Sequence, residues 1–379
     1  MDFAYTEDQH ELVRLARQIF TDRVTHESLT EIESRDGERF DQDLWRTLAE
    51  AGLLGIALPA DLGGGGYGPL EQCLVLEQAA RVLAPVPLHA TAVMGAWTIA
   101  TFGTEAQRER WIPRVAAGDA ILTAALASSP GAQDPAAEDT GSGWHLKGTR
   151  TGVPAATMAD LILIPAGGHV FLVPKDTPGL TITPQRTTAR DTTGLLTLDL
   201  TLPYDARLNA PDIEDIKDMA TLGLCAQQLG VTSRALEAAA DYTTRRHQFG
   251  RPIGSFQAVG HRLADCHIDV EAIRLTTWQA AWLLSPEAKA TKETRSRAVA
   301  TAKFWAADGG HRVAHAVVHV HGGMGIAEEY FVHRYFLHAK QLEFTLGGAT
   351  EQALRLGAML ASTPLTASIT VLPDPLAEV

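Results

Sequence analysis

The first third of the chain repeats its hydrophobic positions at helical spacing. Pro59 and the glycine-rich run 62–68 (LGGGGYG) interrupt the pattern before a new helical stretch, LEQCLVLEQAARVLA. Another helix is expected near Thr104, whose hydroxyl can cap its first turn. These intervals predict an α-helical domain over residues 1–118. Its buried stripe comprises Leu12, Leu15, Ile19, Val24, Trp45, Leu48, Leu53 and Leu54.

Between residues 119 and 212 the pattern changes to short runs with a period of two. The clearest is LLTLDLTL, in which Leu196, Leu198, Leu200 and Leu202 face one side, while the intervening polar residues face the other. Such alternation is typical of strands that are buried on one face. We therefore predict a small β domain over residues 119–212.

From residue 213 the pattern is helical again. From Phe256 to Leu284, apolar or small residues recur at alternating steps of three and four, which predicts a long helix in a bundle. We expect a helical bundle over residues 213–362 and a Pro/Thr-rich tail over 363–379. The order of helices, strands and helices indicates an α+β fold with segregated layers, which argues against a Rossmann fold.

Composition narrows the classes of partner. The 379 residues carry a formal net charge of -13, which disfavours nucleic acid and anionic membranes as bulk partners. The three cysteines are widely spaced, which predicts neither a disulfide framework nor a zinc site. The longest uncharged stretch, 83–104, is interrupted by Pro85, Pro87 and His89, so we predict no membrane span. The first residues, MDFAYTEDQHELVRLARQIF, have the pattern of an amphipathic helix with acidic residues, so we predict no signal peptide and expect a cytoplasmic protein.

Three segments carry candidate chemistry. RRHQFGRPIGSFQ, from Arg245 to Gln257, clusters arginines beside a glycine turn, which suits a phosphate or pyrophosphate. Complementing a helix dipole is the more common role of such arginines when the motif is seen alone. HVHGGMG, from His319, has glycines that bring backbone N–H groups close to a ligand, although a plain helix end has the same appearance. Nearby histidines lack carboxylate or cysteine partners at ligand spacing, so we predict no metal site.

The third segment, LGGATEQ from Leu346 to Gln352, opens the last helix. Thr350 is a candidate N-cap, and the free N–H groups of the first turn could hold an anion. A helix start with no ligand is equally compatible with this sequence.

Taken together and in order, these segments resemble the acyl-CoA dehydrogenase family over nearly the whole chain. GLLGIALPADLGGGGYG, FGTEAQRERWIPRVAAGD, ALASSPGAQDP and GWHLKGTR are similar to its first two domains, and RRHQFGRPIGSFQ and HGGMGIAEEYFVHRYF are similar to its C-terminal signatures. The resemblance implies an α-helical domain, a β-barrel-like middle domain and a C-terminal four-helix bundle, assembled into homo- or hetero-oligomers, either dimers or tetramers.

The resemblance also implies an FAD cofactor and the residues that hold it. Those that match the family's FAD contacts, some of them to FAD bound by a neighbouring subunit, are Arg246, Phe249, Gln257, Gly322 and Gly323. Ser128 stands where a threonine usually meets the flavin ring, His319 replaces a glutamine, and Glu351 matches a position that could contact the adenosine.

The family's reaction is the α,β-dehydrogenation of an acyl-CoA thioester. A carboxylate removes an α-proton, the β-hydrogen passes to the flavin as hydride, and an electron-transferring flavoprotein usually reoxidises the cofactor. The catalytic residue is unknown here, because the usual glutamate position falls on Leu346 or Gly347 and a second known position falls on Ala220. The neighbouring arginine of the second position becomes Thr221, and the strand that usually shields the flavin with an aromatic residue reads TGVPAAT from Thr151.

Three functions remain open at this point. In the first, the chain acts as an acyl-CoA dehydrogenase, alone or as one subunit of the mixed complexes known in one branch of the family. It is a non-catalytic subunit that completes the FAD site of another chain. Or it is a relative of the flavin oxidases and monooxygenases, in which the flavin reacts with oxygen.

Overall fold

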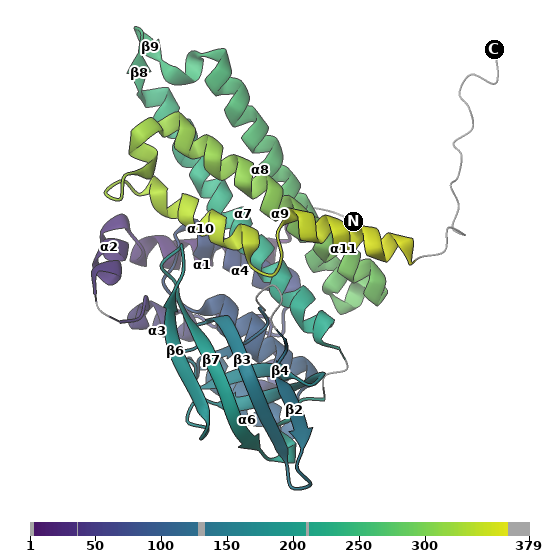
Figure 1. Cartoon of the computed structure of the whole chain (residues 1–379). Coiled ribbons are helices and arrows are strands. Elements are labelled where there is room, and N and C mark those ends of the chain that lie inside the picture. Colours follow the sequence, from purple (N-terminus) through teal and green to yellow (C-terminus); the bar gives the residue numbers. More distant parts are fainter. Residues whose placement is uncertain (1–3, 36, 128–132, 210–211, 363–379) are drawn as a thin grey trace, which may run out of the picture.

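The computed structural model describes residues 4–35, 37–127, 133–209 and 212–362, and Figure 1 shows helices above and behind a β region. The N-terminal segment forms α1 (Glu7–Arg23), α2 (His26–Ser34), α3 (Gln42–Glu50), η1 (Ala60–Leu62), α4 (Pro69–Arg81), the π-helix η2 (His89–Trp97), α5 (Thr98–Phe102) and α6 (Glu105–Ala116). The predicted cap of α6 is confirmed, because Thr104 Oγ1 accepts from Gln107 N at 3.3 Å and the Gln107 side chain returns the contact.

The strands that follow make two sheets with one apolar core between them. The elements are β1 (Leu122–Ala124), β2 (Ala136–Asp139), β3 (Trp144–Pro154), β4 (Leu161–Ala166), β5 (His169–Pro174), β6 (Leu180–Arg186), β7 (Thr192–Leu202) and η3 (Tyr204–Ala206). The sheet orders are β1-β4-β5 and β2-β3-β7-β6, and only β1 and β4 pair in parallel among the described strands. The predicted alternation in β7 is confirmed: Leu196, Leu198, Leu200 and Leu202 are buried, and the polar residues between them are exposed.

The rest of the described chain forms the bundle. It consists of α7 (Ile213–Arg245), the hairpin β8 (His247–Gln248) and β9 (Arg251–Pro252), η4 (Ile253–Ser255), α8 (Gln257–Leu284), η5 (Pro286–Ala288), α9 (Lys292–His321), η6 (Gly322–Ile326), α10 (Val332–Phe344) and α11 (Ala349–Ala361). The long helix predicted from Phe256 is α8. Helix α7 lies at the centre, in contact with α4, α8, α9 and α10. The predicted α+β fold is confirmed, while the exact domain bounds stay predictions.

Buried charge attaches the bundle to the first helices. The guanidinium groups of Arg334 on α10 and Arg39 both contact the Glu33 carboxylate, and all three side chains are about 5–6% exposed. Tyr335 also donates to the carbonyl of Arg81 at 2.7 Å. Such contacts fix the first turn of α10 against the N-terminal segment. No helix among the described residues has both the length and the apolarity that crossing a bilayer requires.

Candidate active-site cavity and bundle end

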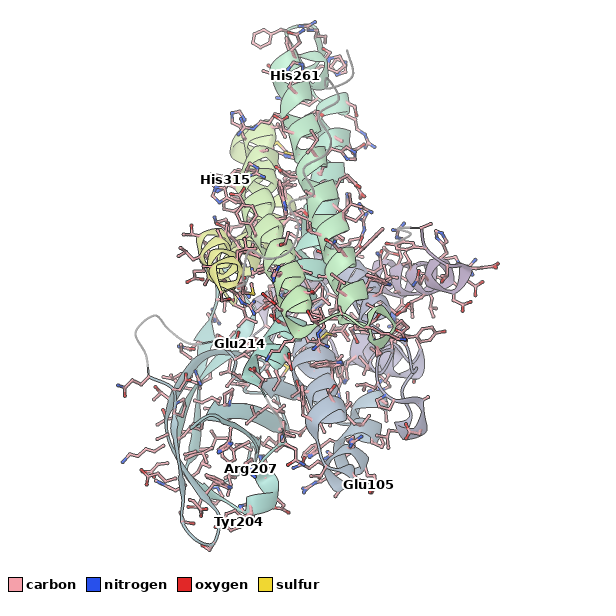
Figure 2. The ribbon with its side chains drawn as sticks, turned by 90° about the vertical axis from the view of Figure 1, so that its right-hand side faces the viewer. Glu105, Tyr204, Arg207, Glu214, His261 and His315 are labelled. Carbon is pink, nitrogen blue, oxygen red and sulfur yellow. The ribbon has the colours of Figure 1, made fainter. Side chains whose placement is uncertain are left out.

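A cavity of about 1080 Å³ lies where the N-terminal helices, the β region and the bundle meet. Its interior wall is largely apolar and has many small side chains. Charged residues at its other end include Glu214, Lys217 and Arg355. Figure 2 shows Glu214 at the junction between the bundle and the sheets. The apolar wall includes Leu76, Ala79, Ala80, Leu83, Leu88, Ala90, Met94, Leu224 and Val231.

Helix α7 supplies one long wall of this cavity. Glu214, Lys217, Thr221, Leu224 and Val231 line it at steps of three, four and seven, which place them on one helix face. At 1.5 Å per residue the stripe is about 25 Å long, with its charged residues in the first turns. Gln227 of α7 and the Arg39–Asp191 pair add polar groups elsewhere in the wall, so the cavity suits an elongated ligand that is apolar along part of its length.

Each carboxylate that lines the cavity in the described part of the chain is held by a donor. Asp191 accepts from Arg39 at 3.2 Å, Glu214 from Lys217 at 2.8 Å, Glu343 from Lys340 at 2.6 Å, and Glu351 from the backbone N–H of Gly348 at 2.9 Å. Each of the four is therefore committed to at least one contact within the chain, and none is without a partner.

Of the sequence positions expected to carry the base, Leu346 and Gly347 line this cavity, and Ala220 does not. Leu346 and Gly347 line the cavity in left-handed conformations, with φ of 55° and 99°. Ala220 is buried, and its carbonyl contacts His89 Nε2 at 2.9 Å. Asp218, a nearby acid, accepts from Ser296 at 2.5 Å and from Arg355 at 2.7 Å. This geometry identifies no carboxylate of the described residues as the catalytic base.

Two polar atoms in the wall are buried without a partner among the described residues. They are Nε2 of His338 and Oε1 of Gln352. Unpaired buried atoms cost free energy, so they mark places where a ligand or water would form a hydrogen bond. Burial lowers the pKa of His338 to about 4, and likewise that of His89. Both rings are therefore neutral at physiological pH.

The predicted FAD-contact residues of the RRHQFG segment lie elsewhere, around the far end of the bundle. Arg246 caps the C-terminus of α7, Phe249 lies in the β8-β9 turn with φ of 52° and 92% exposure, and Gln257 opens α8. All three are exposed. The Arg246 guanidinium has no ion-pair partner within the described residues. Figure 1 shows the hairpin at the tip of the bundle, and Figure 2 places His261 of α8 near that end.

The glycine loop approaches the same end from α9. His319 is exposed in the last turn of α9, and Gly322 has φ of 64°. A Cβ built on Gly322 or Gly323 would meet no atom of the described residues within 4 Å, so the backbone here faces open space. The ring of Tyr242, one turn before Arg246, stacks on that of His321 with centroids 4.4 Å apart.

The cavity and the bundle end are well separated within one chain. From Val231, the last α7 residue in the cavity wall, to Arg246 is about 22 Å along the helix. Glu351 belongs to the cavity and not to the bundle end. Ser128 lies outside the described residues. The structure thus divides the sequence-predicted site residues between two places.

The predicted N-cap of the last helix is wrong. Helix α11 begins at Ala349 with Gly348 as its N-cap, and Thr350 lies inside the first turn. Glu351 at the third helical position receives the N–H of Gly348, which makes half of a capping box without a hydroxyl. Sequence reasoning also missed His338, Lys217 and Arg355, because no motif connects residues so far apart. Gln352 stood in a motif already singled out, but nothing marked its side chain as unpaired.

Comparisons with known proteins agree with this architecture. Residues 6–119 match the acyl-CoA dehydrogenase N-terminal domain and residues 218–360 match the acyl-CoA dehydrogenase C-terminal domain. A relative from Mycobacterium tuberculosis, acyl-CoA dehydrogenase FadE27, is 44% identical over 96% of this chain and 100% of its own length. The bovine mitochondrial short-chain specific acyl-CoA dehydrogenase is 28% identical over 92% of this chain and 89% of its own.

Solved structures give the same result. A chain of the ChsE4-ChsE5 complex from Mycobacterium tuberculosis superposes with a TM-score of 0.91 at 44% identity, covering 96% of this chain and 100% of that one. A chain from a variant of the Tcur3481-Tcur3483 steroid acyl-CoA dehydrogenase gives a TM-score of 0.88 at 44% identity, covering 94% of this chain and 98% of that one. The chain described here therefore belongs to the acyl-CoA dehydrogenase family of oxidoreductases.

Proposed function

We propose that this chain is one subunit of a hetero-oligomeric, FAD-dependent acyl-CoA dehydrogenase, in which its bundle end completes the FAD site of a neighbouring, base-bearing chain. The dehydrogenation of the acyl-CoA thioester then takes place in the cavity of that neighbour. This chain contributes cofactor contacts and subunit stability.

The observation that carries the proposal is the division of the site. Arg246, Phe249 and Gln257 are exposed at the tip of the bundle, about 22 Å along α7 from the cavity of their own chain. This separation keeps them from a group held inside that cavity and favours a cofactor bound by another chain. The base positions Leu346 and Gly347 carry no proton acceptor, so the cavity of this chain lacks the group that would start the reaction.

The residues at the bundle end fit a flavin dinucleotide. Arg246 offers a guanidinium without an ion-pair partner among the described residues, and its fork of donors matches a pyrophosphate oxygen pair. The backbone at Gly322 and Gly323 is open, so a flat or charged group can approach closely. Gln257 adds an exposed carboxamide, and His319 adds an exposed imidazole. When bound, FAD supplies the redox chemistry as the acceptor of the substrate's β-hydrogen.

Two relatives support the mixed assembly. The similar structures described above were solved as a ChsE4-ChsE5 complex and as a Tcur3481-Tcur3483 protein, the latter a steroid acyl-CoA dehydrogenase. By extension, a bulky steroid-type CoA thioester is the substrate class that we propose for the complex. An electron-transferring flavoprotein is the proposed oxidant, since one 28% identical relative is a subunit of a caffeyl-CoA reductase-Etf complex.

The test is to purify this chain alone, and also after co-expression with a second acyl-CoA dehydrogenase chain that carries the glutamate base. We expect colourless protein alone and a yellow complex that bleaches when a steroid acyl-CoA is added. Yellow protein that bleaches without a partner would show that the chain acts alone. Reoxidation by oxygen, with peroxide or an oxygenated product, would favour the oxidase or monooxygenase alternative.

Arg246→Ala in the complex tests the role of the bundle end directly. The loss of a charge-assisted hydrogen bond, worth about 1.5–3 kcal/mol, should weaken FAD binding by roughly 10- to 150-fold. Arg245→Ala is the matched control, because Arg245 is also exposed but is paired with Asp241 at 2.6 Å. It should retain the cofactor. Equal FAD content in the Arg246→Ala complex and the wild-type complex would refute the assignment.

A further inference from the structure

The two cofactor-facing segments at the bundle end are joined by one aromatic contact. Tyr242 of α7 and His321 of α9 stack with ring centroids 4.4 Å apart and planes inclined by 26°. Arg246 follows Tyr242 by one helical turn, and its N–H donates to the Tyr242 carbonyl at 2.8 Å. Gly322 follows His321 directly and turns the chain with φ of 64°. Each cofactor segment therefore begins within four residues of a stacked ring.

The stack is fixed on the α9 side. Nδ1 of His321 lies 2.7 Å from the Val317 carbonyl, which can only accept, so Nδ1 carries the proton. A Cβ on Gly325 would come within 3.1 Å of the His321 Cβ, so η6 packs closely on this residue. Tyr330 adds a second ring at 5.5 Å. His321 itself is 4% exposed and cannot turn outward without loss of these contacts.

We propose that the Tyr242–His321 stack is a positioning device, which sets the separation between Arg246 and the Gly322–Gly323 backbone so that both contact one cofactor. This inference rests on the proposed function, because it assumes that the two segments share FAD. The rings are positioning residues and need not touch the cofactor. Removing either ring loosens the end of α7 relative to the end of α9. Arg246 and the Gly322–Gly323 backbone are then no longer held at the separation that one cofactor requires.

The experiment measures FAD affinity of the complex by equilibrium dialysis, with the absorbance of free and bound flavin as readout. We expect Tyr242→Leu and His321→Leu each to weaken FAD binding by about three- to tenfold, the range for an aromatic pair. The double variant should bind no worse than either single variant, because both remove the same contact. His321→Phe keeps the stack and should stay within about twofold of wild type.

A matched control breaks a different aromatic pair. Trp278→Leu removes the contact between Trp278 on α8 and Tyr5, whose centroids are 4.8 Å apart. It should lower thermal stability without changing FAD affinity. If it weakened FAD binding as much as His321→Leu, the effect would be general loosening of the bundle, and the inference would be wrong.

The remaining outcomes also decide. Wild-type FAD affinity in His321→Leu, together with a loss in Arg246→Ala, would overturn the positioning role and leave the proposed function intact. If His321→Phe bound FAD as weakly as His321→Leu, the imidazole nitrogen and not the stack would be responsible. Wild-type affinity in Arg246→Ala would remove the proposed function and this inference with it.

Discussion

Lys303 is buried in the middle of α9 with 1% exposure, and its ammonium group ends at the last turn of α10. Nζ donates to the carbonyls of Leu342 at 2.5 Å and Glu343 at 3.2 Å. These are carbonyls that a helix end leaves without an intrahelical partner. The lysine thus fixes the start of the loop that carries Leu346 into the cavity. We predict that the effect of Lys303→Met on the free energy of unfolding depends strongly on pH.

Two opposing effects set the magnitude. The variant loses two hydrogen bonds and leaves buried carbonyls unpaired, which costs roughly 2–4 kcal/mol. It also removes a charge that burial penalises, since burial lowers the pKa of Lys303 from 10.5 to about 8. At pH 7 that penalty is on the order of 3 kcal/mol, so the two effects nearly cancel.

The sign of the pH dependence follows from linkage. Between pH 8 and 10.5 the unfolded chain binds the lysine proton more tightly than the folded chain does. The wild-type stability therefore rises with pH in this interval relative to the variant. Between pH 7 and pH 9.5 the gap between wild type and Lys303→Met should widen by about 2 kcal/mol.

The assay is urea unfolding followed by tryptophan fluorescence at pH 7 and pH 9.5. Lys292→Met is the control, because the hydrogen bond with Asp212 raises the pKa of Lys292, so its contribution is fully present at both pH values. Its stability difference from wild type should be constant. A Lys303→Met difference that did not change with pH would refute the reasoning, because it would mean that the ammonium is not penalised in the folded state.

Two further predictions concern the cavity. Leu346→Glu places a carboxylate at an expected base position. We expect the rate of flavin bleaching by acyl-CoA in the complex to stay within about twofold of wild type, because the flavin is proposed to lie in the neighbouring chain. A catalytic base is worth roughly 10²–10⁴ in rate, so a gain of about tenfold or more would contradict that placement. Burial lowers the pKa of His89 to about 4, so its contribution to stability is fully present above pH 6.5 and is lost as the pH falls towards 4. Between pH 7 and pH 5, the free energy of unfolding of wild type should fall by up to about 2 kcal/mol more than that of His89→Gln, as measured by urea unfolding. An equal fall in both proteins would disprove the lowered pKa of His89.

The sequence predicted those parts of the fold that local pattern controls. The structure has three features that depend on near neighbours in the sequence. They are the period of two in β7, the alternating steps of three and four in α8, and the Thr104 cap of α6. The π-helix at His89–Trp97 was not predicted. Its close packing, with Gly95 against Leu122 so tightly that a Cβ would lie 2.4 Å from the Leu122 side chain, is set by a distant segment. The N-cap of α11 was missed although the contact is local: the Glu351 side chain accepts the N–H of Gly348, and the helix begins before Thr350.

The candidate site was predictable only in part. Motifs identified the bundle-end residues, because family resemblance reads contiguous segments such as 245–257. The cavity is lined from Arg39 to Arg355, and no local pattern brings such distant residues together. The sequence shows that Leu346 and Gly347 carry no proton acceptor. The structure adds that two nearby acids, Asp218 and Glu343, are paired with Arg355 and Lys340.

Helix α7 explains why the two halves of the site can evolve separately in one chain. Its first half lines the cavity from Glu214 to Val231, and its last residues lead to Arg246. The helix is packed along its length against α4, α8, α9 and α10, which favours a rigid spacer over a hinge. A substitution that removes the base at one end therefore leaves the donors at the other end in place. A chain with this layout can lose proton abstraction and still be required for the cofactor of its neighbour.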